Sequence, residues 1–195
     1  MNVSPVVLEG DIVRLEPLLA AHAEDLARVG LDPSLWRLQP RPVETIDDMR
    51  AYVELALADR KSVPFAIFDR GAGAIIGSTR FMDIAPEHRR LEIGATWLSP
   101  ARQRTGANIE AKLLMLAHAF DVVGVQKVVF KTEASNDQSR RALLALGAVE
   151  EGTLRSQLLS DDGRRRDMVY FSILDHEWPA VRERNVARLT RHRKS

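Results

Sequence analysis

Residues 89–134 constrain the fold more than any other part of the chain, because they join a strand pattern, a polar loop, a long helical pattern and a second strand pattern. The stretch "RRLEIGATWLS" alternates like a strand over 89–99, and "KVVFKTEA" predicts another strand over 127–134. Between them, apolar residues recur at helical spacing from about Ala107 to Val123, which predicts a helix with one buried face. This order indicates helices packed on a sheet.

The chain on either side of this unit supplies further strands and helices. Strand patterns cover residues 8–18, 63–69, 74–82, 148–159 and 166–174, and helical patterns cover 20–30, 45–61, 136–147 and the basic end from about 178 to 195. Thr45 with Asp48 forms a capping pattern for the second helix, and Gly147 is placed to close the fourth. We therefore predict one domain over residues 1–195, of α+β class, with a single mixed and mostly antiparallel sheet of about seven strands flanked by helices.

Composition excludes several classes of function. The chain has 28 Lys and Arg against 27 Asp and Glu, and it has no cysteine, so it offers no disulfide, no thiol nucleophile and no cysteine metal site. The start of the chain lacks the pattern of a secretion signal, and no apolar run approaches the roughly 18 residues of a membrane span. We therefore expect a cytoplasmic protein without a membrane partner.

Two further features favour structural interpretations. Basic residues gather near the C-terminal end, without interleaved aromatic residues, and a solvated helix face or frayed end is the expected interpretation, so no nucleic-acid partner is predicted. The stretch "DHEW" at 175–178 holds possible metal ligands, but adjacent side chains point in different directions, so no metal site is predicted.

The loop "ARQRTGAN" at 101–108 is the first candidate binding site. The exposed N–H groups of the first turn of a helix, together with the helix dipole, attract phosphate. Gly106 lets the backbone approach a ligand, and Arg102 and Arg104 are able to pair with phosphate. Taken alone, the loop is more typical of a simple turn before a helix. It matches neither the Walker loop nor the dinucleotide-binding pattern.

The order of these motifs resembles the GNAT superfamily of acyl-CoA-dependent N-acetyltransferases, and within it the ribosomal-protein N-terminal acetylase group, the RimJ/RimL type. In that family a Q/R-x-x-G-x-G/A loop cradles the pyrophosphate of coenzyme A with backbone amides. The matching residues here are Gln103, Arg104, Thr105, Gly106, Ala107 and Asn108. Asn108 departs from the Gly or Ala of the family pattern. The resemblance implies acetyl-CoA as cofactor, with its pantetheine arm paired to the strand end around Trp97 and Leu98.

A second block of the resemblance begins at Asn136. It reads Asn136-Asp137-Gln138-Ser139, followed by Leu146-Gly147-Ala148. In relatives the Asn bonds the pantetheine arm, and a Ser or a later Tyr lies near the thiol. The Tyr position falls on Leu143 or Leu144, which leaves Ser139 as the candidate proton donor. Without the family context, Asn136 is more typical of a plain helix N-cap.

Acyl transfer to an amine also requires a base, because an alkylammonium is protonated at neutral pH. Strand alternation would place Leu91, Ile93, Ala95 and Trp97 on one face and Glu92, Gly94, Thr96 and Leu98 on the other. Glu92 then stands among small neighbours, where a substrate fits, and the resemblance also favours a Glu at this place. The alternative is a solvated Glu92 paired with Arg89 or Arg90.

The acceptor side is assigned more loosely. Trp36 and Phe81 are candidates for the wall of the acceptor pocket, because in relatives the segment between the first two helices borders it, and His88 is a loop residue that could face the substrate mouth. His118 is expected to pack at the edge of the core. Trp97 is expected to pack in the core.

Together these features predict an acetyl-CoA-dependent N-acetyltransferase over 1–195 that acts on a primary amine, either a protein N-terminus or a small-molecule amine. The absence of cysteine agrees with direct transfer in a ternary complex. The alternative is a non-catalytic acyl-CoA-binding module on the same fold. The resemblance also makes a homodimer possible.

Overall fold

The computed structural model describes residues 1–39 and 41–192, and within them the strands form one eight-stranded sheet in the order β1-β2-β3-β4-β5-β6-β8-β7. The strands are β1 (Leu8–Glu9), β2 (Val13–Pro17), β3 (Val63–Asp69), β4 (Ala74–Ala85), β5 (Arg90–Leu98), β6 (Lys127–Glu133), β7 (Val149–Leu159) and β8 (Arg165–Leu174). Neighbouring strands are antiparallel except for β5 and β6, which are parallel. The predicted mixed, mostly antiparallel sheet is confirmed.

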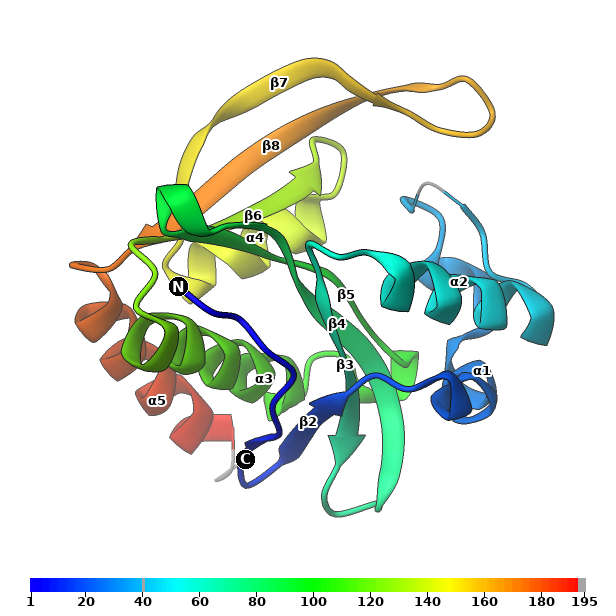
Figure 1. Cartoon of the computed structure of the whole chain (residues 1–195), viewed down its shortest axis with the longest axis horizontal. Helices are drawn as coiled ribbons and strands as arrows, with labels where there is room; N and C mark the ends of the chain where they lie inside the picture. Colours follow the sequence, from blue (N-terminus) through cyan, green and yellow to red (C-terminus); the bar gives the residue numbers. More distant parts are fainter. Residues whose placement is uncertain (40, 193–195) are drawn as a thin grey trace.

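Helices cover both faces of this sheet (Figure 1). They are α1 (Ala23–Gly30), α2 (Ile46–Ala58), α3 (Gly106–Ala117), α4 (Asp137–Leu146) and α5 (Trp178–His192). Side chains from α3, α4 and α5 share one core with the sheet, and side chains from α1 and α2 form a second core. The predicted caps are present: Thr45 and Asp48 make a capping box at the start of α2, and Gly147 closes α4 with a φ of 108°.

The first predicted strand, 8–18, is wrong in one respect, because a tight turn divides it into β1 and β2. The cause is the carboxylate of Glu110 on α3, which accepts hydrogen bonds from the backbone N–H groups of Asp11 (3.1 Å), Ile12 (2.6 Å) and Val13 (2.7 Å). Gly10 N–H closes the turn on the carbonyl of Val13. A buried carboxylate with several N–H donors holds a turn in place of a strand.

The C-terminal prediction also needs correction. α5 is a folded helix that packs on α3, with Trp178, Val181 and Leu189 in the core, and is more than a solvated face. Asn185 is fully buried and donates to the carbonyl of Leu146 at the end of α4. The predicted tail residues 193–195 lie outside the described residues.

The strand β5 contains the irregularity that matters most for the site. Arg80 of β4 pairs with Gly94, but Ser78 pairs with Trp97, so Ala95 and Thr96 together oppose one residue of β4. Ala95 has a φ of 47°, in the left-handed region. This is a β-bulge, and a bulge moves every following side chain to the other face.

The bulge overturns the face assignment made from alternation. Trp97 packs in the core beneath α1 and α2, whereas Leu98 packs in the core with Leu91 and Ile93 beneath α3. Thr96 also faces α3, because Lys112 of that helix donates to its hydroxyl. The predicted core position of Trp97 is correct, but it lies on the opposite face from Leu91 and Ile93.

Candidate active site

The site begins where β5 and β6 part. Parallel pairing in the described structure joins Arg90–Glu92 to Lys127–Val129 and stops there. Beyond Glu92 the bulged half of β5 leads away toward the loop that begins α3. Strands that separate in this way leave main-chain N–H and C=O groups free for a ligand that lies between them.

The predicted binding loop forms the far end of this opening. Thr105 is the N-cap of α3: its hydroxyl accepts from the N–H of Ala107 (3.2 Å) and donates to the carbonyl of Arg102 (2.8 Å). Gln103 reaches back and donates to the carbonyl of Leu98 (3.2 Å). Arg104 has a φ of 60°, a left-handed conformation that tightens the loop. These contacts fix the loop at the N-terminus of α3, where first-turn amides have no partner within the helix itself.

The two arginines of the loop differ in their surroundings. Arg102 forms an ion pair with the largely buried Asp69 of β3 (3.1 Å), so it anchors the loop to the sheet. Arg104 is exposed and therefore available to an anion. Asn108, which departs from the family pattern, has a buried Oδ1 atom with no hydrogen-bond partner among the described residues. A buried acceptor without a partner is costly, which points to a ligand or water at this place.

Glu92 lies at the point where the strands separate. Its side chain is 6% exposed, and Lys131 of β6 lies 2.7 Å from its Oε2 atom. Burial raises the pKa of Glu92, and the Lys131 ammonium partly opposes that shift. The proposed pairing with Arg89 or Arg90 is not observed, because Arg89 donates to a carbonyl and Arg90 pairs with Asp83. A buried carboxylate with a raised pKa suits a general base near neutral pH.

Asn136 and Ser139 occupy the first turn of α4. The Asn136 side chain accepts from the N–H of Ser139 at 3.0 Å, so the N-cap interpretation is confirmed as one of its roles. Among the described residues, its side-chain N–H₂ group donates no hydrogen bond. The Ser139 side chain is half-buried.

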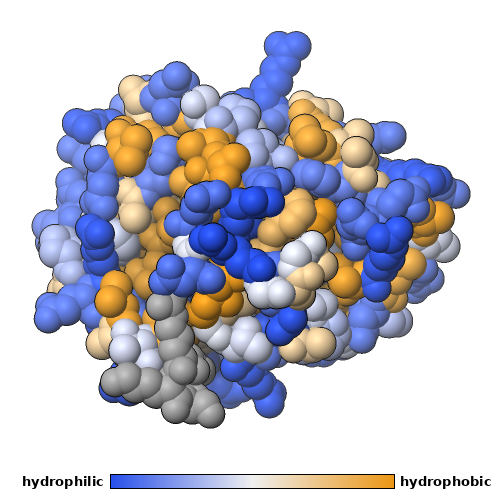
Figure 2. All heavy atoms as spheres, turned by 90° about the horizontal axis from the view of Figure 1, so that it is seen from below, coloured by the Kyte–Doolittle hydropathy of each residue, from blue (hydrophilic) through white to orange (hydrophobic). Residues whose placement is uncertain are grey.

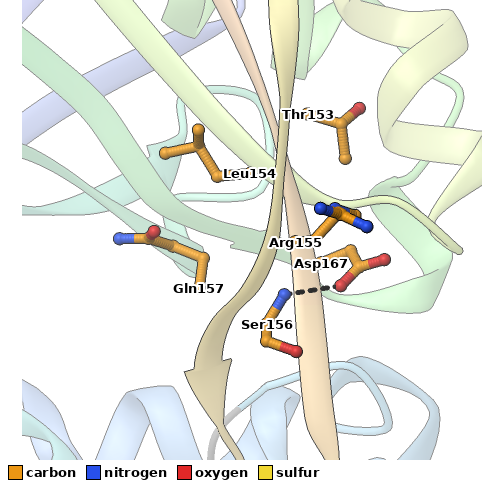
Figure 3. A pocket seen from close by; sticks show the side chains of 6 residues that line it. All are labelled: Thr153, Leu154, Arg155, Ser156, Gln157 and Asp167. Atoms are coloured by element: carbon orange, nitrogen blue, oxygen red, sulfur yellow. Dashed lines mark hydrogen bonds between the residues drawn. The ribbon is translucent and has the colours of Figure 1, made fainter.

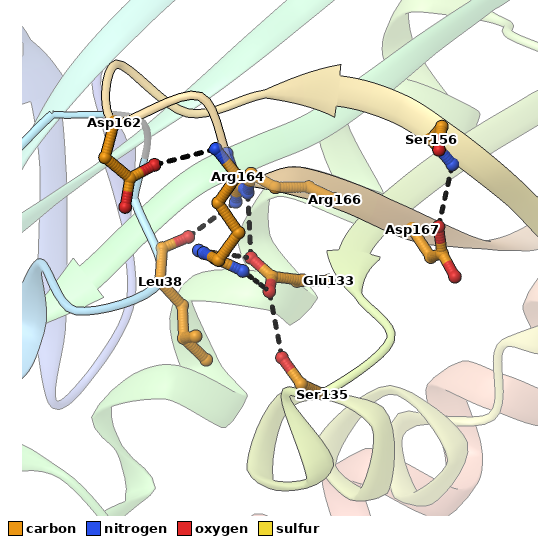
Figure 4. Close-up of polar contacts among 8 residues, drawn as sticks. All are labelled: Leu38, Glu133, Ser135, Ser156, Asp162, Arg164, Arg166 and Asp167. Carbon is orange, nitrogen blue, oxygen red and sulfur yellow. Dashed lines mark hydrogen bonds and ion pairs between the residues drawn. The ribbon is translucent and has the colours of Figure 1, made fainter.

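A second charged cluster, which sequence reasoning missed, closes the end of β6 (Figure 4). Glu133 is ion-paired with Arg164 and with the buried Arg166, and it accepts from the hydroxyl of Ser135 (2.9 Å). Burial disfavours the ionised form, but the hydrogen bonds from Arg164, Arg166 and Ser135 outweigh it and lower the pKa of Glu133 to about 2. Arg166 also donates to the carbonyl of Leu38 (2.6 Å), which ties the segment after α1 to β8.

The β7–β8 hairpin continues this enclosure. Its turn reaches the segment between α1 and α2 through an ion pair of Asp161 with Arg41 (3.1 Å). A bulge in β7 places the N–H of Ser156 2.7 Å from Asp167, and residues on both sides of it line a pocket (Figure 3). The pocket is lined by Thr153, Leu154, Arg155, Ser156, Gln157 and Asp167.

The predicted acceptor residues are scattered. Trp36 is buried beside Tyr52 and Trp97 with ring centroids 5.4 and 5.5 Å away, so it packs in the core beneath α1 and α2. Phe81 is fully buried in the opposite core and leaves no surface for a substrate. His88 is exposed on the β4–β5 connection, beside the paired end of β5.

Other predictions concern packing and binding partners. His118 stacks on Phe81 at 6.0 Å, as expected of a residue at the core edge, and burial lowers its pKa. Across the described residues, no cluster of three or more acidic or His side chains is arranged to hold a metal ion. Nor does the described chain contain a helix long and apolar enough to span a bilayer. On the face seen in Figure 2, apolar and polar side chains interleave.

Comparison with known proteins agrees with this geometry. The family model "Acetyltransferase (GNAT) domain" matches residues 13–149. A crystal structure of a provisional acetyltransferase from T. thermophilus is 40% identical, with a TM-score of 0.90 over 97% of this chain and 100% of that one. The chain belongs to the GNAT acetyltransferase family.

Within the GNAT family, the similarity extends to the RimJ/RimL-like group. A provisional ribosomal N-acetyltransferase of Bacillus subtilis, YdaF, is 27% identical over 54% of this chain. The chain spans less than two thirds of the curated relatives that it matches, 64% and 57% of their lengths. Mycobacterium smegmatis RimJ in complex with CoA-disulfide shares the fold, with a TM-score of 0.77, 23% identity and coverage of 94% of this chain and 92% of that one.

Proposed function

We propose that this GNAT protein transfers the acetyl group of acetyl-CoA directly to a primary amine in a ternary complex. The observation that carries the proposal is the parting of β5 and β6 beyond Glu92, which opens onto the capped first turn of α3. A thioester supplies an activated acyl group, and the protein has to hold it, expose it to the amine and manage protons.

The chain offers a group for each part of binding. First-turn amides of α3 around Gly106 and Asn108 would hold the pyrophosphate, with Arg104 beside them. The free backbone of β5 near the bulge would pair with the pantetheine arm, and the Asn136 amide would donate to it. The unpartnered Oδ1 atom of Asn108 fits this assignment, because pantetheine carries amide N–H donors.

Glu92 is the proposed base. On its side of β5 the neighbouring Gly94 carries no side chain, and a Cβ there would lie 2.8 Å from the Glu92 Oε1 atom. The Met82 sulfur would lie 2.7 Å from the same Cβ, so a residue larger than Gly at this position would crowd the carboxylate. Lys131 fixes the carboxylate without leaving a net charge, so the pair is able to accept the amine proton locally.

The acceptor would approach beneath the β7–β8 hairpin and the segment between α1 and α2. Two contacts join these elements, Arg41 with Asp161 and Arg166 with Leu38. The name of YdaF, a ribosomal N-acetyltransferase, associates that relative with the ribosome, and a protein N-terminus is therefore the first acceptor to test.

The test has two stages. Coenzyme A should raise the melting temperature of the wild type, since a ligand that binds only the folded state stabilises it. Release of free thiol from acetyl-CoA should then depend on an amine in a panel of N-terminal peptides, polyamines and amino acids. Glu92→Gln should lower turnover by about 100-fold, whereas the exposed Glu54→Gln on α2 serves as the matched control.

Each stage separates one alternative. No stabilisation by coenzyme A at millimolar concentration would refute the proposed binding site. Stabilisation without thiol release on any amine would instead favour a non-catalytic acyl-CoA-binding module. Normal turnover by Glu92→Gln would remove Glu92 as the base while leaving the transferase assignment intact.

A further inference from the structure

A lysine is buried beneath the opening between β5 and β6. Lys112 on α3 is 9% exposed, and its ammonium donates to the hydroxyl of Thr96 at 2.6 Å. The same ammonium lies 5.9 Å from the ring centroid of Phe130 on β6. Thr96 follows Glu92 on β5 and Phe130 follows Val129 on β6, and Glu92 and Val129 are the last residues that pair these two strands with each other. The ammonium therefore lies under the gap itself.

This buried charge is poorly satisfied by the described residues. An ammonium has three N–H donors, and Thr96 is the one hydrogen-bond acceptor that the described structure gives it. No described carboxylate forms an ion pair with it. Burying a charge with so few partners is costly, so its retention calls for an explanation beyond packing.

The surroundings of Lys112 form a polar stripe in an apolar layer. Asn108 lies one helical turn earlier on the same face of α3, and its Oδ1 atom is buried without a described partner. Thr96 is held by Thr79 of β4, with 2.7 Å between the two hydroxyl oxygens. Two incompletely satisfied groups on one helix face point to a polar ligand in the gap above them.

Burial also makes Lys112 a usable acid near neutral pH. It lowers the pKa of the Lys112 ammonium to about 7, and the field of Glu92 on β5 partly opposes that shift. Around the ammonium, β4 presents the Thr79 hydroxyl and β6 presents the Phe130 ring, neither of which is charged. Glu92 is thus the charged group that influences this lysine.

We propose that Lys112 donates the proton that the leaving sulfur takes up during acetyl transfer. The inference rests on the proposed function. The amine first loses a proton to water; its nitrogen then forms the N–C bond as the C–S bond breaks and sulfur departs with the electron pair. Glu92 takes the second amine proton, and Lys112 Nζ gives one to sulfur. Proton return from Glu92 to Lys112 restores both groups, so one proton is released overall.

Ser139 is the competing donor, and its chemistry is less suited. A serine hydroxyl is a far weaker acid than an ammonium, and the contact recorded for Ser139 is made by its backbone N–H. Lys112 instead carries a positive charge beneath the gap, where it would also stabilise a thiolate before the proton moves.

The test is the thiol pKa of coenzyme A bound to the protein, followed by the ultraviolet absorbance of the thiolate as pH is raised. Wild-type protein should lower that pKa by about one unit relative to free coenzyme A, because the thiolate and the Lys112 ammonium stabilise each other, so the lysine keeps its proton to higher pH once the thiolate forms. Lys112→Met, which keeps most of the unbranched chain but removes the ammonium, should return it to the free value. Lys61→Met at the exposed Lys61 should behave like wild type.

Turnover supplies the second readout. Lys112→Met should lower kcat by about 100-fold with little change in KM, as expected when an acid that acts only in the transition state is removed. If Lys112→Met fails to fold, Thr96→Val removes the hydroxyl that positions the ammonium and should raise the bound thiol pKa in the same direction.

The outcomes are distinct. Equal thiol pKa values for coenzyme A bound to wild type and to Lys112→Met would overturn the role of Lys112, while binding itself would still support the proposed function. Failure of coenzyme A to bind the wild type at all would overturn the proposed function and, with it, this inference.

Discussion

Replacing Glu110 by Ala should destabilise the protein strongly, because its carboxylate organises the turn between β1 and β2. Three backbone N–H groups donate to it, from Asp11, Ile12 and Val13, at 2.6 to 3.1 Å. A hydrogen bond to a charged group contributes about 1.5–3 kcal/mol, and relaxation of the turn toward water recovers part of the loss. We therefore expect the free energy of unfolding to fall by about 4 kcal/mol.

Glu110→Gln should destabilise the protein less than Glu110→Ala does, because it keeps one acceptor oxygen. Its remaining oxygen can replace Oε2, which receives Ile12 and Val13, but it loses the charge and the bond from Asp11. About half of the loss should follow, roughly 2 kcal/mol. Glu54→Ala on the exposed face of α2 should stay within about 0.5 kcal/mol of wild type.

Urea unfolding followed by circular dichroism measures all three variants. For a chain of this length, Glu110→Ala should also lower the melting temperature by about 10 °C. A loss below about 1 kcal/mol for Glu110→Ala would refute the reasoning, since the turn would then be held by other contacts. Equal losses for Ala and Gln would refute the graded role of the two oxygens.

Three further predictions concern charge and space near the site. Glu133→Gln should lower the free energy of unfolding by about 3 kcal/mol at pH 7. The difference in unfolding free energy between wild type and variant should shrink as pH falls from about 4.5 toward the Glu133 pKa of about 2, because protonation removes the stabilisation by the ion pairs. A difference that stays constant over this pH range would contradict the prediction. Lys112 remains protonated in the unfolded chain up to about pH 10. The free energy of unfolding of wild type, relative to that of Lys112→Met, should therefore rise by a few kcal/mol between the folded Lys112 pKa of about 7 and about pH 10. A wild-type to variant difference in urea unfolding that does not change over this pH range would exclude the lowered pKa. Gly94→Ala places a methyl group 2.7 Å from the Met82 sulfur and 2.8 Å from Glu92 Oε1. Because this methyl group would displace the Glu92 carboxylate, the substitution should reduce kcat by about tenfold with little loss of coenzyme A affinity. Unchanged turnover would show that the position of Glu92 is not critical.

Local chemistry made much of this structure predictable. Thr45, Asp48 and Gly147 identify helix ends because caps depend on residues close in sequence. The loop at 101–108 was recognisable for the same reason, although the use of Arg102 as an anchor to Asp69 depends on how β3 packs. The fold class followed from the order of such local signals.

Features that depend on distant partners were not predictable. Glu110 is 99 residues away from Asp11, so the strand pattern at 8–18 gave no sign of the turn. The partners of Glu92 and Glu133 come from β6 and β8, and they depend on strand register, which a single sequence does not specify. The bulge at Ala95 left no signal in the alternation, so the faces of Thr96 and Trp97 were exchanged.

The bulge in β5 has a consequence for communication across the sheet. One peptide bond joins Thr96, which holds the Lys112 ammonium on the α3 side, to Trp97, which packs against Trp36 on the α1 side. A rotation of that single peptide unit displaces both side chains together. A ligand that enters the gap above Lys112 and moves Thr96 would therefore also move Trp97 and the aromatic side chains that pack against it. The path between the two events is no longer than two residues.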